Sequence, residues 1–151
     1  MLALLLFLSA QTSTLSYFER ITLSSEFLCE GASIGDLDGD GDPDIAAGPW
    51  WYEGPEFKAR HAFYPAVAFD RQAYSDHFFS WILDVDGDKR NDVFVVGFPG
   101  VDAYWMKNPG TKDGNWERFL VFRGVDNESP WFTDITGDGK PELACQHDEA
   151  L

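Results

Sequence analysis

The sequence predicts an all-β protein assembled from a repeated unit of four antiparallel strands. Three observations lead to this prediction. Acidic runs of similar spacing begin at Asp36, Asp84 and Asp134, so the runs are separated by 48 and 50 residues. Short apolar and partly β-branched segments flank each run, in a chain of which 16% is aromatic. No window of adequate length shows a helical period.

Each acidic run is expected to join the first strand of a unit to the second. The first strands are predicted within 29–35, 77–83 and 129–133, and the second strands within 44–48, 92–97 and 142–146.

In the first two units a third and a fourth strand follow. The third strands are expected within 50–55 and 103–110, which end in turn residues, and the fourth within 58–64 and 116–122. A repeated four-stranded antiparallel unit of about 50 residues is typical of the blades of a β-propeller.

We therefore expect a partial propeller over residues 17–151, with one blade at 27–70, a second at 76–123 and an incomplete third at 129–151. Residues 17–23 resemble the fourth strand of the second blade and predict a lone outer strand of the kind that closes propellers. Because propellers have four to eight blades, about two and a half blades predict a fragment of a longer propeller whose remainder is missing. Such a piece should form an open arc with exposed apolar faces, or other contacts should replace the missing blades.

The first ten residues are apolar, end in small residues and are too short to span a bilayer. They predict a signal peptide at 1–10 with cleavage after Ala10, and hence a secreted, periplasmic or cell-surface protein without a membrane span in the mature chain. A buried first strand is the alternative interpretation. Cys29 and Cys145 are expected to be small buried side chains, although an exported protein could pair them.

The charge is clustered and strongly negative. The chain has 26 acidic and 11 basic residues and a formal net charge of -15. Such an excess of negative charge excludes nucleic acid as a partner, because the phosphate backbone would be repelled.

The acidic runs have the spacing of calcium ligands. Calcium takes six to eight oxygen ligands, and carboxylates at alternating positions of a tight loop can turn inward around one point. Carboxylates this close repel one another unless a cation lies between them, which favours a metal site over a solvated turn. The predicted ligands at positions 1, 3, 5, 7 (through the carbonyl) and 9 are Asp36, Asp38, Asp40, Asp42 and Asp44; Asp84, Asp86, Asp88, Arg90 and Asp92; and Asp134, Thr136, Asp138, Lys140 and Glu142.

The three loops are unequal. Lys89 stands where the first loop has Gly41, which predicts a strained turn and weaker binding. Thr136 removes one carboxylate from the third loop, and the longer Glu142 must fit where the others have aspartate. EF-hands are excluded, because they need flanking helices and a glutamate at position 12, where these loops have apolar residues or cysteine.

The loops and the strands after them resemble the FG-GAP or VCBS repeats of bacterial secreted proteins and of integrin α-subunit propellers. Residues 97–100 and 48–50 stand where the family often has its Phe-Gly and Gly-Ala-Pro elements, and both depart from that pattern. The resemblance covers nearly the whole chain after residue 10. It implies a calcium-stabilised propeller and does not imply one activity.

No catalytic motif is found, and a pairing of Asp76 with His77 is disfavoured because neighbouring residues of a strand point to opposite faces. We expect a non-catalytic binding or adhesion module that recognises a glycan or an extracellular protein. The alternative is a piece of a secreted polysaccharide-active enzyme, since some polysaccharide lyases resemble this propeller. Trp50 and Trp51 are candidates for ligand contact, but packing between blades is the favoured explanation of both.

Overall fold

The computed structural model describes residues 19–112, 114–126 and 128–148. These residues form ten strands in three antiparallel sheets, and no helix occurs among them. The all-β prediction is therefore confirmed. The described chain accordingly contains no helix that could span a membrane. The signal peptide predicted at 1–10 lies outside the described residues.

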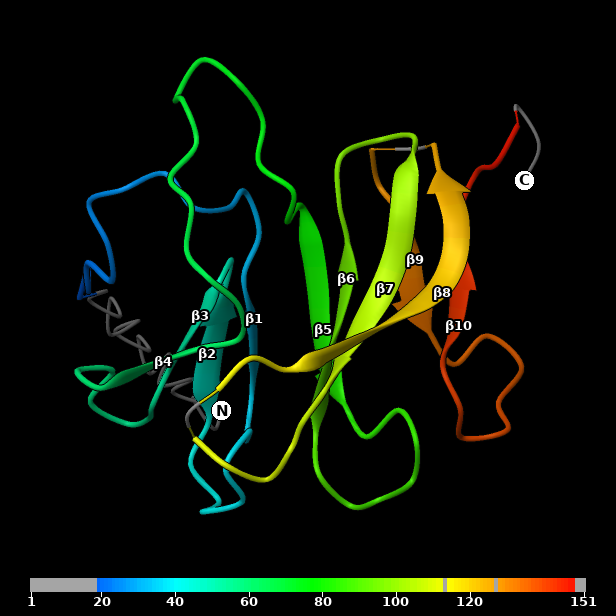
Figure 1. The fold of residues 1–151 in the computed structure, drawn as a ribbon. Helices are drawn as coiled ribbons and strands as arrows, with labels where there is room; N and C mark the ends of the chain where they lie inside the picture. Colours follow the sequence, from blue (N-terminus) through cyan, green and yellow to red (C-terminus); the bar gives the residue numbers. More distant parts are fainter. Residues whose placement is uncertain (1–18, 113, 127, 149–151) are drawn as a thin grey trace, which may run out of the picture.

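The sheets follow the chain in simple order (Figure 1). The first sheet consists of β1 (Ser33–Gly35), β2 (Asp44–Ala47), β3 (Trp50–Tyr52) and β4 (Arg60–Ala62). The second consists of β5 (Phe79–Leu83), β6 (Asp92–Val96), β7 (Val101–Lys107) and β8 (Glu117–Val125). The third contains β9 (Trp131–Thr133) and β10 (Glu142–Ala144).

The repeat seen in the sequence is also a repeat of strand register. The residue before each acidic run pairs with the last residue of that run's ligand pattern, so Gly35 pairs with Asp44 and Leu83 with Asp92. The third sheet repeats this register at Thr133 and Glu142. Each acidic run is therefore a hairpin loop between the first two strands of a sheet.

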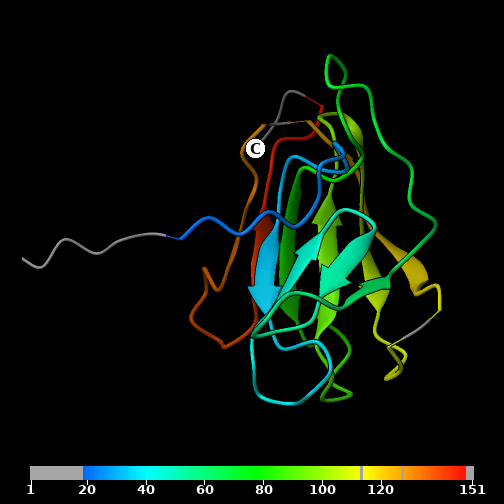
Figure 2. The same cartoon turned by 90° about the vertical axis from the view of Figure 1, so that its left-hand side faces the viewer.

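The three sheets lie face to face in a row, and their acidic loops emerge at the same rim (lower edge of Figure 1). Figure 2, seen from the side of the first sheet, shows the sheets one behind another. Two four-stranded sheets and the first two strands of a third, packed in this way, are blades of a β-propeller.

The second sheet is buried on both faces, and β6 shows why its sequence is a continuous apolar run. Val93 and Val95 pack toward the first sheet in one core with Trp51. Phe94 and Val96 point the other way and form a second core. The Phe94 ring stacks on Phe132 of the third sheet with centroids 4.7 Å apart. A strand between two neighbouring blades has no solvent face, so alternation of polar residues is lost.

The two end sheets leave their outer faces open. Ser33 bonds to Ser80 of the second sheet, so the next residue, Ile34, faces outward and is 71% exposed. At the other end Phe132 packs inward, and its neighbour Trp131 is 68% exposed. The expectation of an open arc with exposed apolar faces is therefore confirmed.

One predicted element is not a strand in the described residues. The outer strand expected at 17–23 has no strand in its described part, residues 19–23. A lone strand requires an open sheet edge to pair with. The two-stranded third sheet lies at the opposite end of the row from these residues (Figure 1), so they cannot reach its free edge.

The cysteines are both half-buried and both free. Cys145 packs against the core between the second and third sheets. Cys29 lies beside Gly48 of the first sheet. The two cysteines were expected to be small buried side chains, and the structure buries both only in part.

Candidate metal-binding loops

The first aspartate of each loop organises the turn. Asp36 accepts hydrogen bonds from the backbone N–H groups of Gly39 at 2.7 Å and Gly41 at 3.1 Å. Asp84 and Asp134 accept bonds from the same two loop positions, at distances between 2.6 and 2.9 Å. Because one carboxylate spans positions 4 and 6, the chain is bent around it and the following carboxylates are brought close.

The residue at position 7 is placed by a second recurrent bond. The backbone N–H of Asp42 donates to the carboxylate of Asp40 at 2.8 Å. Arg90 and Lys140 donate in the same way to the aspartates at position 5, at 3.0 and 2.9 Å. The residues predicted to offer a carbonyl ligand are thus held beside the carboxylate at position 5 in all three loops.

The last carboxylate closes the loop against the body of the blade. Asp44 is 1% exposed and accepts hydrogen bonds from Leu37 N–H at 2.7 Å and Gly54 N–H at 2.8 Å. Asp92 is equally buried and accepts hydrogen bonds from Val85 N–H at 3.0 Å and Asn108 N–H at 2.8 Å. Burial raises the pKa of both carboxyl groups, because it disfavours the charged form.

The third loop compensates for its longer acid. Glu142 reaches the backbone N–H groups of Ile135 at 2.8 Å and Thr136 at 3.2 Å through one oxygen. The Thr136 hydroxyl lies 3.4 Å from the other oxygen. Glu142 therefore occupies the place that aspartate has elsewhere, and Thr136 turns toward it.

Carboxylate oxygens converge in all three loops. In each loop three acidic residues offer an oxygen within 4.8 Å of the other two. These residues are Asp36, Asp38 and Asp40; Asp84, Asp86 and Asp92; and Asp134, Asp138 and Glu142.

Two predicted carboxylate ligands lie outside these groups. Asp44 bonds to the same backbone positions as Asp92, but no oxygen of it belongs to the group of the first loop. Asp88 is turned toward basic side chains and bonds to Arg90 and Lys107. The second loop therefore gathers positions 1, 3 and 9, whereas the first gathers positions 1, 3 and 5.

The strained turn predicted at Lys89 is confirmed. Its φ is 71°, in the left-handed region that favours glycine, and the glycine at this position of the first loop, Gly41, has a φ of 94°. The chain adopts the same turn in both loops, and Lys89 bears the steric strain that Gly41 avoids.

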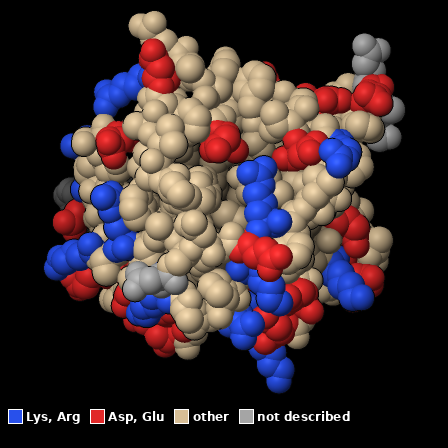
Figure 3. Space-filling view, viewed as in Figure 1, with Lys and Arg blue, Asp and Glu red and all other residues tan. Residues whose placement is uncertain are grey.

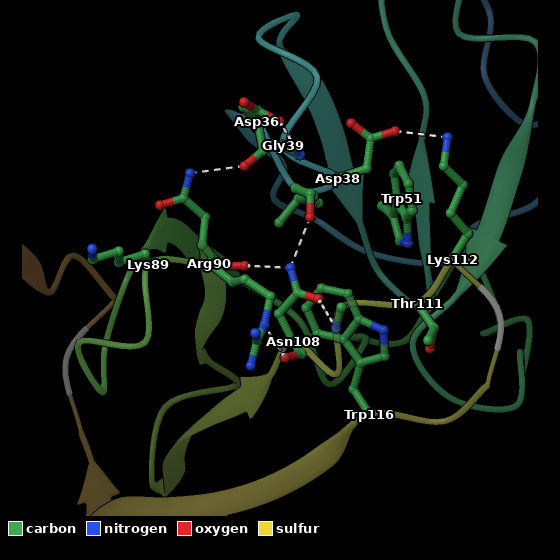
Figure 4. A pocket seen from close by; sticks show the side chains of 13 residues that line it. Asp36, Asp38, Gly39, Trp51, Lys89, Arg90, Asn108, Thr111, Lys112 and Trp116 are labelled. Atoms are coloured by element: carbon green, nitrogen blue, oxygen red, sulfur yellow. Dashed lines mark hydrogen bonds and ion pairs between the residues drawn. The ribbon is translucent and has the colours of Figure 1, made fainter.

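Two asparagines that the sequence did not indicate hold the first loop against the second blade. Figure 4 shows Asn108 beside this loop. Asn108 is 2% exposed and donates to the carbonyls of Leu37 at 2.7 Å and Asn91 at 2.8 Å. Asn91 donates to the carbonyl of Asp36 at 2.7 Å. The sequence indicated only that Asn108 lies in a turn. Its hydrogen bonds could not be predicted, because one partner, Leu37, lies 71 residues away along the chain.

The first loop borders a cavity of about 250 Å³ between the first two blades. Trp51 and Trp116 form its apolar wall, and Lys112 lies at its edge (Figure 4). The Lys112 ammonium bridges Asp38 at 2.7 Å and Glu53 at 3.0 Å. Hydrogen bonds to Asp38 and then to Glu53 raise the pKa of Lys112.

Of the two tryptophans of the first blade, only Trp51 packs between blades as expected. Trp51 is buried in the core between the first two sheets. Trp50 points to the other face of its sheet, and the Arg60 guanidinium lies 4.3 Å from its ring centroid. Asp76 and His77 also diverge: His77 is fully buried, whereas Asp76 is exposed.

One further group of possible metal ligands lies away from the loops. Asp126, His147 and Asp148 are exposed and offer ligand atoms within 4.8 Å of one another. His147 Nδ1 lies 2.8 Å from the Gly124 carbonyl. Sequence reasoning missed the group because it joins the end of β8 to a segment about 20 residues later.

Comparison with known protein families finds one match: residues 84–145 match the family described as FG-GAP-like repeat. This stretch runs from the first aspartate of the second loop to just past β10. The resemblance inferred from the loops is therefore confirmed for residues 84–145. Neither the curated proteins nor the solved structures contain a match to the chain.

Proposed function

We propose that this chain, whose residues 84–145 are an FG-GAP-like repeat, is a calcium-binding β-propeller module of an exported protein. Calcium ions would stiffen one rim of the module, and the module itself would serve in binding or adhesion without catalysis. The observation that carries this proposal is the convergence of three carboxylates in each of three loops that share one hydrogen-bond frame.

The donor set fits calcium. The converging groups offer oxygen atoms and no nitrogen or sulfur, as a hard cation of six to eight ligands requires. In the first loop Asp36, Asp38 and Asp40 are accompanied by two more aspartates and by no basic residue between positions 36 and 44. Carboxylates this close repel one another, and a divalent cation would remove that repulsion.

A structural role for the ion follows from what each loop touches. The first loop joins β1 to β2, and Asp44 bonds to the backbone just after β3. Asn91 and Asn108 tie the same loop to the neighbouring blade. An ion bound to the carboxylates would therefore rigidify three segments of one blade and its contact with the next.

The rim opposite the loops supports a role in recognition. A cavity of about 350 Å³ there is bordered by Tyr74, Phe98 and Arg118. The rings of Tyr74 and Phe98 lie 4.8 Å apart, and Tyr74 is 65% exposed. Exposed aromatic faces beside charged groups suit a glycan, which stacks its apolar face on rings and bonds through its hydroxyls.

The calcium proposal is tested by comparing two neighbouring acids of the first loop. We expect Asp40→Asn to weaken calcium binding by that loop at least tenfold, because Asp40 is one of the three converging carboxylates. Asp42→Asn removes the same charge, but this residue is predicted to offer only its carbonyl, so binding should be kept. Isothermal titration with calcium measures both, and the calcium-induced rise in Tm should follow the same order.

Equal Tm values of the wild-type protein in calcium and in chelator would refute the calcium proposal. For the recognition role, glycan-array binding that Tyr74→Ala abolishes without loss of fold would support a non-catalytic module. Release of unsaturated sugars from a polysaccharide would overturn it in favour of the lyase-like alternative.

A further inference from the structure

The second loop differs from the first in carrying its own cations. Between positions 84 and 92 it contains four aspartates and two basic residues, Lys89 and Arg90, whereas the first loop has five aspartates and none. Figure 3 shows basic and acidic side chains in contact along the lower rim. The electrostatic potential that a cation meets therefore differs between the two loops, although their backbones have the same turn.

A lysine from the neighbouring strand reaches into the second loop. Lys107, the last residue of β7, bonds to the carboxylate of Asp86, and its ammonium lies 3.2 Å from that of Asp88. Arg90 holds the other side of Asp88. Two of the four predicted carboxylate ligands are thus already paired with side chains of the protein.

The pairing accounts for the ligand geometry. In the first loop the carboxylate at position 5, Asp40, converges with those at positions 1 and 3. In the second loop Asp88 has the same position but is drawn away toward Lys107 and Arg90, and the buried Asp92 completes the group instead. A calcium ion at the second loop would have to displace the Lys107 ammonium group before the Asp88 carboxylate at position 5 could coordinate it.

The first blade has an acid at the place of Lys107. Asn108 N–H bonds to Asp92 in the second blade, and Gly54 N–H bonds to Asp44 in the same way in the first, so the residues before them, Lys107 and Glu53, are structurally equivalent. Glu53 adds a negative charge beside the first loop. Lys112, from the connection between β7 and β8, pairs with Glu53 and with Asp38 at position 3, but Asp40 at position 5 stays in the converging group. In the second loop Lys107 pairs with both position 3 and position 5.

We propose that Lys107 is the resident cation of the second loop, so that its ammonium group stabilises this loop in place of calcium while the first loop takes the ion. The inference rests on the proposed calcium function and divides the loops into an ion-dependent and an ion-independent class. One rim of the module would then keep its shape at the second blade whether or not calcium is present.

Matched substitutions at position 3 test the assignment in the full chain. Isothermal titration with calcium should show that Asp38→Asn removes one bound ion, whereas Asp86→Asn leaves the number of ions unchanged. Both substitutions remove one charge from equivalent places. Loss of one ion on Asp86→Asn would overturn the proposal, because the wild-type second loop would then be a calcium site.

Substitution of the lysine supplies the converse test. Lys107→Gln should raise the calcium affinity of the second loop at least tenfold and add one bound ion, and Asp86→Asn in the same chain should remove it. Lys58→Gln changes the net charge equally at an exposed residue that pairs with Glu56, away from the loops, and should add none. An unchanged ion number in a folded Lys107→Gln protein would contradict the inference.

Stability gives a second readout that does not depend on counting ions. In chelator, Lys107→Gln should lower Tm, because Asp86 and Asp88 lose their partner, and calcium should restore it. Glu53→Lys should do the reverse in the first loop by weakening calcium binding at least tenfold. If the wild type binds calcium at the first loop but none of these differences appears, only the present inference fails; if no protein binds calcium, the proposed function fails as well.

Discussion

At the scale of the single residue, His77 shows how burial changes the chemistry of a side chain. The side chain is fully buried, and neither ring nitrogen has a hydrogen-bond partner among the described residues. Its backbone carbonyl accepts hydrogen bonds from Glu30 N–H at 3.1 Å and Gly31 N–H at 3.3 Å. Burial lowers the pKa of His77 to about 4, because a charged imidazolium would be poorly solvated there.

His77 should make the fold sensitive to acid. The pKa of an unfolded histidine is about 6.5, so the unfolded chain binds a proton between pH 6.5 and 4 that the folded chain does not. The contribution of His77 to the free energy of unfolding is therefore fully present above pH 6.5 and is lost as pH falls toward 4. At pH 5 the loss is about 2 kcal/mol. We expect His77→Phe to flatten the dependence of the unfolding free energy on pH in this window, measured by urea denaturation.

A control separates this effect from general titration. Val93→Ala shortens another fully buried side chain without removing a titratable group, so it should lower stability at every pH and leave the slope between pH 4 and 6.5 nearly unchanged. If the His77→Phe protein loses stability with acid as steeply as the wild type, another group is responsible for the slope.

At the scale of the element, the acidic hairpin is the unit that recurs. The turn needs a positive φ at positions 4 and 6, and glycine supplies it at Gly41 and Gly139, with φ of 94° and 87°. Lys89 adopts 71° at the same position. The loop keeps its shape because the hydrogen bonds to the first aspartate hold the turn against the strain of one side chain.

The turn predicts opposite effects for one substitution in each loop. Lys89→Gly should raise the free energy of unfolding by about 1 kcal/mol, because glycine adopts the left-handed conformation without strain. Gly41→Ala should lower the free energy of unfolding by about 1 kcal/mol, because alanine is strained in this conformation. Nothing lies within 4 Å of the added Cβ, so no steric clash contributes to the loss. Thermal unfolding in chelator measures both changes without a contribution from calcium.

Lys89→Ala distinguishes relief of strain from removal of charge. Alanine removes the lysine charge but retains a Cβ, so this variant should not gain the stability that glycine gives. An equal gain in Lys89→Ala would mean that charge, not backbone strain, is what the glycine substitution relieves.

At the scale of the whole molecule, the described residues form an arc with two interfaces between blades and two open outer faces. The inner interface of the third blade packs Phe132 against Phe94 and Trp81, with centroids 4.7 and 5.5 Å apart. Trp131, which occupies the place in the third blade that Trp81 has in the second, lies on the open face. The contribution of each tryptophan to stability therefore depends on whether a neighbouring blade covers it.

This difference can be measured with two equivalent tryptophans. Trp81→Ala should lower the free energy of unfolding by about 2–4 kcal/mol, because it leaves a cavity against Phe94 and Phe132. Trp131→Ala should change it by less than about 1 kcal/mol, since the ring is mostly in solvent. Urea denaturation gives both values, and acrylamide should quench Trp131 strongly. A larger loss at Trp131 than at Trp81 would show that its face is covered in solution.

Much of this arrangement could be predicted from the sequence. The spacing of Asp36, Asp84 and Asp134 predicted the blades, and the apolar segments around them predicted every strand of the three sheets. These features are local: loop chemistry and strand pattern repeat within each unit of about 50 residues. The strain at Lys89 was predicted for the same reason, because backbone φ preferences belong to single residues.

Contacts between blades could not be predicted in this way. The hydrogen bonds of Asn108 to Leu37 and the pairing of Lys107 with Asp86 join residues that are distant in sequence. The lone strand expected at 17–23 did not form within its described part, since pairing requires an edge within reach.

The sequence by itself therefore determined the all-β repeat, the FG-GAP-like repeat at residues 84–145 and the three loops in which carboxylates gather, because these depend on short-range spacing. Only the tertiary structure decided which acids converge and which are already paired with lysine. Side chains such as Lys107 and Lys112 reach the loops from other strands or from the neighbouring blade, and electrostatic interaction depends on distance in space, not on separation along the chain.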